Sequence, residues 1–131
     1  MNNRIYSYRD LEVYQLAFEL ALSIHRFTMK FPKHETYEMG QQMRNASKRI
    51  PACIAEGFGK KDSELEFKRF ISISHGSVQE MKVWLEFSEA FQYVREREIK
   101  ELWERYDKLG RKLYRLKESW KTYSRKRDSD I

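Results

Sequence analysis

Residues 63–88 read SELEFKRFISISHGSVQEMKVWLEFS, and this stretch decides the fold class. Ser63 and Glu66 match the capping box with which helices begin. Small and apolar residues then recur at alternating steps of four and three positions. An α-helix turns once every 3.6 residues, so this spacing puts them on one face and predicts an amphipathic helix. They are Phe67, Ile71, Ser74, Val78, Met81, Leu85 and Ser88.

The same spacing recurs in three other segments, within residues 13–31, 35–56 and 99–123. Short connections between four such helices make sequential neighbours antiparallel. We therefore predict one all-α, antiparallel up-and-down four-helix bundle over residues 1–131, with frayed ends at 1–8 and 125–131. The three stripes are Val13, Ala17, Leu20, Ile24, Phe27 and Phe31; Met39, Met43, Ala46, Ile50 and Cys53; and Ile99, Leu102, Tyr106, Leu109, Leu113, Leu116, Trp120 and Tyr123.

Four residues in these segments or directly after them have special roles. Pro51 lacks a backbone donor and is expected to kink the second helix, and Gly57 is expected to end it. Gly76 lies inside the third helix, where glycine costs about 1 kcal/mol against alanine. We expect a neighbouring helix to approach Gly76 closely, where Pro51 bends its partner. Cys53 continues an apolar stripe and is expected to be a small buried hydrophobe. The other interpretation of Cys53 is a reactive thiol.

Composition excludes several classes of protein. The 131 residues suit one domain, and five glycines and two prolines are too few for the turns of a β-sandwich. The single cysteine rules out an intramolecular disulfide, which fits a reducing cytoplasm. No apolar run is long enough to span a bilayer, and the first residues do not resemble a secretory signal. We expect a cytoplasmic protein without a membrane partner.

Motifs for catalysis and metal binding are not recognisable. No glutamate stands three residues before His25, His34 or His75, as the di-iron bundles require, and the zinc-protease helix motif is missing. The serines carry no motif that supplies a base. We therefore expect no metal, no cofactor and no enzymatic activity.

Positive charge is concentrated in the last helix. The chain carries +6 overall, yet residues 105–127 hold ten basic and two acidic residues, so the remainder is negative. A basic row along one flank of a helix can neutralise successive phosphates of nucleic acid. The other interpretation is a solvated face. The expected phosphate contacts are Lys108, Arg111, Lys112 and Arg115.

The connection at residues 57–62 reads GFGKKD and adds two further candidate contacts, Lys60 and Lys61. Two glycines and two lysines before a helix can cradle a phosphate. The loop matches neither a dinucleotide fingerprint nor a P-loop, so the other interpretation is a helix end followed by a solvated turn.

Aromatic residues make up 15% of the chain, and several lie off the apolar stripes. Such rings either stack on bases or pack against another subunit. The residues are Tyr8, Tyr14, Tyr37, Trp84, Trp103 and Tyr114.

Residues 50–60, IPACIAEGFGK, resemble a motif of the four-helix-bundle proteins named for the intervening sequences of bacterial 23S rRNA genes. The family pattern there is approximately SIPxNIAEGxG followed by Arg or Lys. Other stretches also agree with the family's sequence pattern. They are DLEVY at 10–14, FPKHETY at 31–37, QMRNA at 42–46, EF at 66–67, Phe70, and GS at 76–77 followed by Glu80. Cys53 replaces the usual Asn, and Lys48-Arg49 replace Val-Ser.

This resemblance implies a four-helix bundle that assembles into a ring, commonly a pentamer, without catalytic residues. Accessory proteins of diversity-generating retroelements are similar in fold and partner a reverse transcriptase and nucleic acid. By analogy, we expect a homo-oligomer that binds RNA or DNA, with a nucleic-acid-processing protein as a further candidate partner. The alternative is a homo-oligomeric protein-interaction scaffold with no nucleic-acid role.

Overall fold

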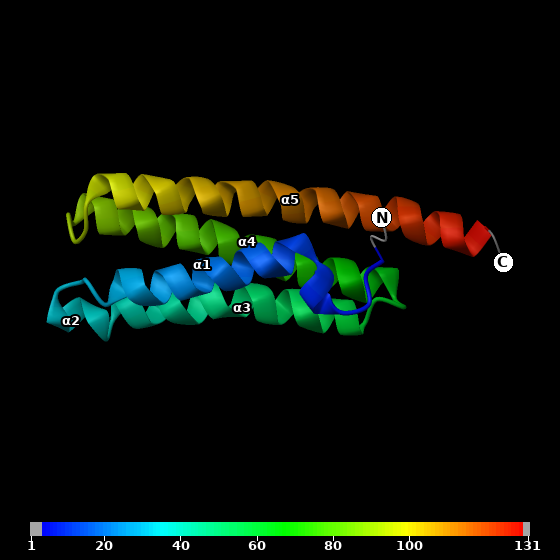
Figure 1. Ribbon diagram of the computed structural model, residues 1–131, viewed down its shortest axis with the longest axis horizontal. Helices are drawn as coiled ribbons and strands as arrows, with labels where there is room; N and C mark the ends of the chain where they lie inside the picture. Colours follow the sequence, from blue (N-terminus) through cyan, green and yellow to red (C-terminus); the bar gives the residue numbers. More distant parts are fainter. Residues whose placement is uncertain (1–3, 130–131) are drawn as a thin grey trace.

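The structure, a computed structural model, describes residues 4–129 and the side chains of residues 4–120. Its elements are the 3₁₀ turn η1 (Tyr8–Asp10) and the helices α1 (Glu12–Thr28), α2 (Lys33–Thr36), α3 (Met39–Gly59), α4 (Glu64–Ala90) and α5 (Glu96–Ser129). The described range contains no strand. Four long helices run antiparallel (Figure 1), so the predicted all-α four-helix bundle is confirmed. Residues 1–3 and 130–131 lie outside the described residues, and fraying at the two ends stays a prediction.

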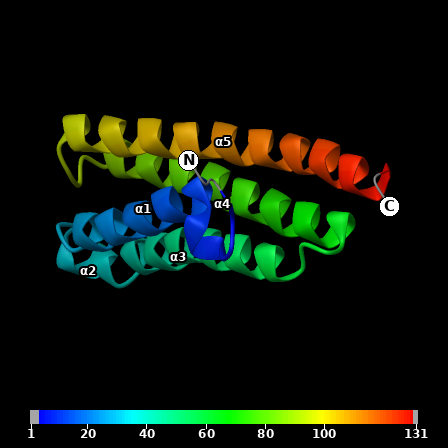
Figure 2. The ribbon, with the colours of Figure 1, turned by 45° about the vertical axis from the view of Figure 1, so that its right-hand side comes forward.

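The long helices sit at the corners of a square, in the order α1, α3, α4, α5 (Figures 1 and 2). Each packs against the next, and α5 closes the square against α1, so α3 and α5 lie diagonally opposite. Two ion pairs connect α5 with the start of α1 and with the residues that follow α1. Lys112 Nζ lies 2.6 Å from Glu12 Oε1, and Lys30 Nζ lies 2.9 Å from Glu98 Oε1.

The core follows the predicted stripes. Of the stripe residues predicted for α1, α4 and α5 whose side chains are described, all are buried except Leu116 and Trp120, which pack half-buried against the core. Tyr123 lies outside the described side chains. Phe67 stacks on Trp120, with 4.3 Å between ring centroids, and this contact joins the start of α4 to α5. The buried residues predicted to share one core are Val13, Leu20, Ile24, Phe67, Ile71, Met81, Leu85, Leu102, Leu109 and Leu113.

The second predicted helix differs from the observed one. The pattern predicts a continuous helix over residues 35–56, but a single turn, α2, precedes a break at Tyr37 and Glu38, and α3 then continues through Pro51 to Gly59. The expectation that Gly57 ends the helix is therefore wrong. Cys53 is half-buried, and Ile54 takes the core position. Partial burial raises the pKa of the Cys53 thiol, which opposes the reactive thiolate form.

The close approach between α3 and α4 is real but does not involve Gly76. Gly76 is exposed, and a Cβ atom added there would meet nothing within 4 Å. Gly57 is the tightly packed glycine, because an added Cβ would lie 2.8 Å from the Cβ of Phe70. Near Pro51, the small residue is Ser74, whose hydroxyl donates to the carbonyl of Ile50 at 3.3 Å. The expected packing role of Gly76 is wrong.

Substituting the two glycines with alanine should have opposite effects. Gly57→Ala should lower the free energy of unfolding by about 1–3 kcal/mol, because the methyl group collides with Phe70 near the backbone. Gly76→Ala should raise it by about 0.5–1 kcal/mol, because the methyl group enters open space in a helix. Urea unfolding at one fixed protein concentration measures both. A Gly57→Ala variant as stable as the parent contradicts the assigned packing against Phe70.

Leu109 is fully buried in α5, whereas Leu65 in the first turn of α4 is 78% exposed. Leu109→Ala should cost about 2–5 kcal/mol through reduced burial and a residual cavity. Leu65→Ala removes the same atoms from a solvated site and should change stability by less than about 0.5 kcal/mol. Equal destabilisation of the two variants in thermal or urea unfolding would show that the core is not centred on Leu109.

Candidate nucleic-acid interface and two apolar faces

The outward face of α5 carries the exposed cations. Lys108, Arg111 and Arg115 are spaced by three and four residues, which places them on one side of the helix, and all three are exposed. Arg105, one turn earlier, is half-buried. Among the described side chains, neither Lys108 nor Arg115 has an ion-pair partner. These two side chains are therefore available to an external anion.

Lys112 has a structural partner. It is half-buried, and its Nζ donates to Glu12 Oε1 at 2.6 Å across the α1–α5 contact. This hydrogen bond and the charge of Lys112, with a smaller effect of Lys108, lower the pKa of Glu12. Glu12 thus compensates much of the charge of Lys112, which leaves Lys112 less available to an external anion than Lys108 or Arg115.

Arg111 is held more loosely. Its Nη1 lies 3.7 Å from Asp107 Oδ2, and Lys82 of α4 donates to the other oxygen of Asp107 at 2.9 Å. The hydrogen bond from Lys82 is the main cause of the lowered pKa of Asp107. The ammonium of Lys82 also lies 4.3 Å from the centre of the Trp103 ring, which is half-buried. Two cations thus share one carboxylate, and the group keeps a net positive charge.

Lys60 and Lys61 are not brought into the row on α5. They follow α3, which lies diagonally across the bundle from α5. Lys60 Nζ lies 4.9 Å from the Phe70 ring centre, and Lys61 Nζ lies 4.5 Å from the Phe58 ring centre. Because α3 extends to Gly59, the predicted GFGKKD loop is reduced to a short turn. Its glycines do not form a cradle.

The first apolar face lies between α1 and α3. It is a groove of about 460 Å³ in which exposed Phe18 and Leu22 of α1 lie beside Pro51 and Ala52 of α3. Tyr8 and Tyr14 pack edge to face at one end, with ring centroids 4.9 Å apart. Its polar lining residues are His25 and Lys48. We call this surface the α1–α3 face.

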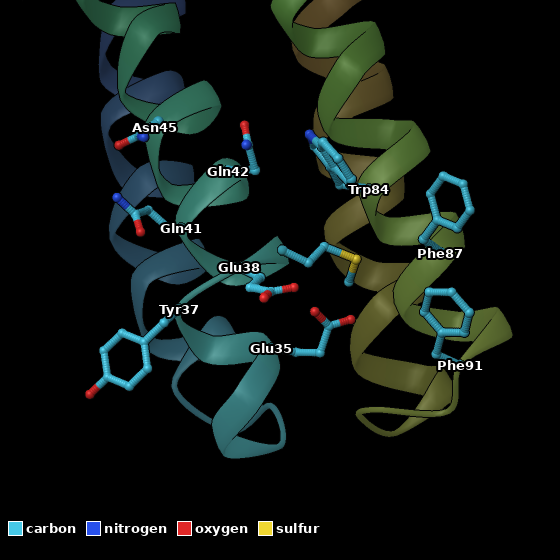
Figure 3. Close-up of a pocket in the computed structure, with 10 residues that line it drawn as sticks. Glu35, Tyr37, Glu38, Gln41, Gln42, Asn45, Trp84, Phe87 and Phe91 are labelled. Carbon is cyan, nitrogen blue, oxygen red and sulfur yellow. The ribbon is translucent and has the colours of Figure 1, made fainter.

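The second apolar face lies between α3 and α4. Figure 3 shows Trp84 and Phe87 on α4 and Phe91 just beyond its end, across from Gln42, Glu38 and Glu35. Neighbouring rings lie 6.2 and 5.8 Å apart, and Phe87 and Phe91 are about half exposed. The groove holds about 650 Å³ and includes Glu35 and Glu38. We call this surface the α3–α4 face.

Sequence reasoning finds only part of these faces. Tyr14 and Trp84 are candidates from the sequence because they lie off the stripes, whereas Phe18, Leu22, Phe87 and Phe91 are not among those candidates. The signal is present, since these four residues also lie off the stripes. An aromatic residue off the stripe can be assigned to an apolar face only when its neighbours on adjacent helices are known.

Within residues 4–129, no group of three or more His, Cys, Asp or Glu side chains is placed to hold a metal ion. None of the described helices has the length and hydropathy needed to cross a membrane.

Comparison with known proteins supports the fold and identifies the family. A crystal structure of a protein with unknown function from the S23 ribosomal protein family of Bacteroides thetaiotaomicron VPI-5482 superposes with a TM-score of 0.74. That protein is 18% identical, and the alignment covers 80% of this chain and 97% of the other. No curated protein matches the sequence. The family model for the 23S rRNA-intervening sequence protein matches residues 9–115, and the chain belongs to that family.

Proposed function

We propose that the protein is a homo-oligomer that binds RNA or DNA through phosphates on the outer face of α5. The observation that carries this proposal is the row of three exposed cations, Lys108, Arg111 and Arg115, on one face of one helix. Each neutralised phosphate releases counterions, so such a row favours any nucleic-acid backbone. Contacts of this kind carry little sequence information. The proposal includes no cofactor and no catalytic step.

The homo-oligomer rests on the two apolar faces. Exposed aromatic rings gathered in a groove are typical of surfaces that contact another protein. Their polar residues are complementary, because Lys48 and His25 line the α1–α3 face and Glu35 and Glu38 line the α3–α4 face. A heterologous contact therefore joins the α1–α3 face of one copy to the α3–α4 face of the next.

The placement of the two faces favours a closed ring. They occupy adjacent sides of the square bundle and meet at α3. Each copy is therefore turned relative to the last, and a succession of such contacts curves toward closure. The family resemblance implies five copies in such a ring. In such a ring α3 points toward the axis, and α5, at the opposite corner, lies on the outside. Several copies of the basic row then act together, which raises affinity through multivalency.

A second candidate function is a protein-interaction scaffold, in which the charge of α5 serves only solubility. The same apolar faces favour it, because they fit a protein partner without any role for α5. A nucleic-acid-processing protein is a partner that fits both functions, because it would occupy the apolar faces while α5 contacts the nucleic acid. Salt dependence of nucleic-acid binding separates the scaffold from the binding protein.

Replacing Lys108, Arg111 and Arg115 together with glutamine should weaken binding to every nucleic acid tested. Glutamine keeps helix propensity, so the variant should remain folded and oligomeric. The slope of log affinity against log salt should become shallower by about 0.9 on duplex, or about 0.7 on single strands, for each phosphate that is no longer neutralised. Fluorescence anisotropy at several salt concentrations measures both quantities.

A matched control removes three exposed cations from the other end of the bundle, as Lys33→Gln, Arg95→Gln and Arg97→Gln. Its net charge equals that of the test variant, so it should bind as the parent does, apart from a small general weakening. Equal weakening in both triple variants would mean that only total charge matters. A parent that fails to bind at low salt would favour the scaffold.

The proposed contact between faces makes a distinctive prediction about mixing. Phe18→Glu should disable the α1–α3 face, and Phe87→Glu should disable the α3–α4 face, because each places a charge in an apolar contact. The parent should have a mass several times 16.0 kDa by light scattering. Each variant alone should be a monomer, and an equimolar mixture should form pairs through the one intact contact.

Two results contradict this arrangement. If the mixture stays monomeric, the two faces are not partners of each other. If one variant alone remains oligomeric, its altered face is not part of the contact. Circular dichroism of each variant checks that the helices are intact.

A further inference from the structure

On the basic side of the bundle, a groove lies between α4 and α5. It holds about 300 Å³ and is lined by His75 and Gln79 of α4 and by a run of α5 residues around Arg111. Gly110 is buried at its floor, where an added Cβ would lie 3.3 Å from Val78 and 3.7 Å from His75 Nε2. The two helices therefore approach closely there, and a shallow channel remains above them.

The charges lining the groove suit an anion. Arg111 and Arg115 both line it, and Arg115 forms no ion pair with another described side chain. The one carboxylate, Asp107, already accepts a hydrogen bond from Lys82 at 2.9 Å and lies 3.7 Å from Arg111 Nη1. The charge of Asp107 is therefore already compensated, and Asp107 holds Arg111 only loosely, so the guanidinium nitrogens of Arg111 remain available to phosphate oxygens.

Tyr114 makes this groove different from a simple row of cations. Its side chain is 59% exposed and stands at the edge of the groove, between Arg111 and Arg115 in the sequence. Trp103, on the same side of α5, is instead covered by the ammonium of Lys82. Of these two aromatic residues, only Tyr114 offers a largely uncovered ring. An exposed ring flanked by cations is the arrangement on which a base stacks while its phosphates are neutralised.

We infer that the α4–α5 groove binds one nucleotide of an unpaired nucleic-acid strand, with its base stacked on Tyr114 and its phosphates on Arg111 and Arg115. This inference rests on the proposed nucleic-acid binding and adds a preference that phosphate contacts alone do not produce. His75 and Gln79 provide donors and acceptors for the edge of that base. In a duplex, both faces of each base are covered by neighbouring bases, so Tyr114 has no stacking partner.

The test compares a short mixed-sequence DNA strand with the same strand annealed to its complement, using anisotropy at low salt. Tyr114→Ala should weaken binding to the single strand by about 5- to 150-fold, the equivalent of about 1–3 kcal/mol for one stacked base. Binding to the duplex should change by less than about twofold, because the cations that contact phosphate are intact. Tyr114→Phe keeps the ring and should bind both as the parent does.

Tyr6→Ala is the matched control, because Tyr6 is 71% exposed and is not among the residues that line the α1–α3 face, the α3–α4 face or the α4–α5 groove. It should leave both affinities unchanged. The inference is wrong if Tyr114→Ala weakens the two forms equally, if it weakens neither, or if Tyr114→Phe weakens binding as much as Tyr114→Ala. In each of these cases the parent still binds, so the proposed function survives. A parent that binds neither form overturns both.

Discussion

Burial of the four apolar stripes against one another constrains every other part of the molecule. The side chains at the centre, among them Leu109, Phe67 and Ile54, are almost completely removed from water, and they leave each helix only its outer half for contact with anything else. The polar groups that do enter the core are mostly satisfied locally, as when Ser88 donates to the carbonyl of Trp84 at 2.9 Å. Tyr106 is an exception, since its buried hydroxyl has no hydrogen-bond partner among the described groups, and burial raises the pKa of that hydroxyl. The outer faces of the helices and the grooves between neighbouring helices are therefore the surfaces left for contact with other molecules.

Periodicity is enough to predict the helices and most of the core, because a stripe at steps of three and four has only one face to bury. It fails where the outcome depends on a second helix. After Ile50, the stripe can continue three residues later at Cys53 or four residues later at Ile54, and both spacings suit a helix. Only Ile54 faces the core. The choice of Gly76 over Gly57 fails for a similar reason. Sequence spacing shows that a glycine lies within a helix. Whether that glycine is tightly packed depends on the atoms of a neighbouring helix, which the spacing does not reveal.

In the candidate site, too, some features can be predicted from one helix alone, whereas others depend on the contact between two helices. The positive charge of α5 can be counted in the sequence, and the outward direction of Lys108, Arg111 and Arg115 follows from their spacing. The partner of Lys112 cannot be found in this way, because Glu12 lies one hundred positions away and at the other end of the chain's path through the bundle. Likewise, Trp103 and Tyr114 look equivalent as off-stripe aromatics. Only the position of Lys82 on α4 distinguishes the covered ring from the exposed one.

The closing of the square by α5 against α1 has a consequence for the order in which the chain can fold during synthesis. When α1, α3 and α4 have left the ribosome, their stripes can meet only on two sides, and the surface that later faces Leu102, Leu109 and Leu113 is open to water. A nascent chain of that length is a three-helix intermediate with an apolar trough along it, a kind of species prone to association. Helix α5 ends this exposure, and its ion pairs with Glu12 and Lys30 connect it to α1 and to the residues that follow α1.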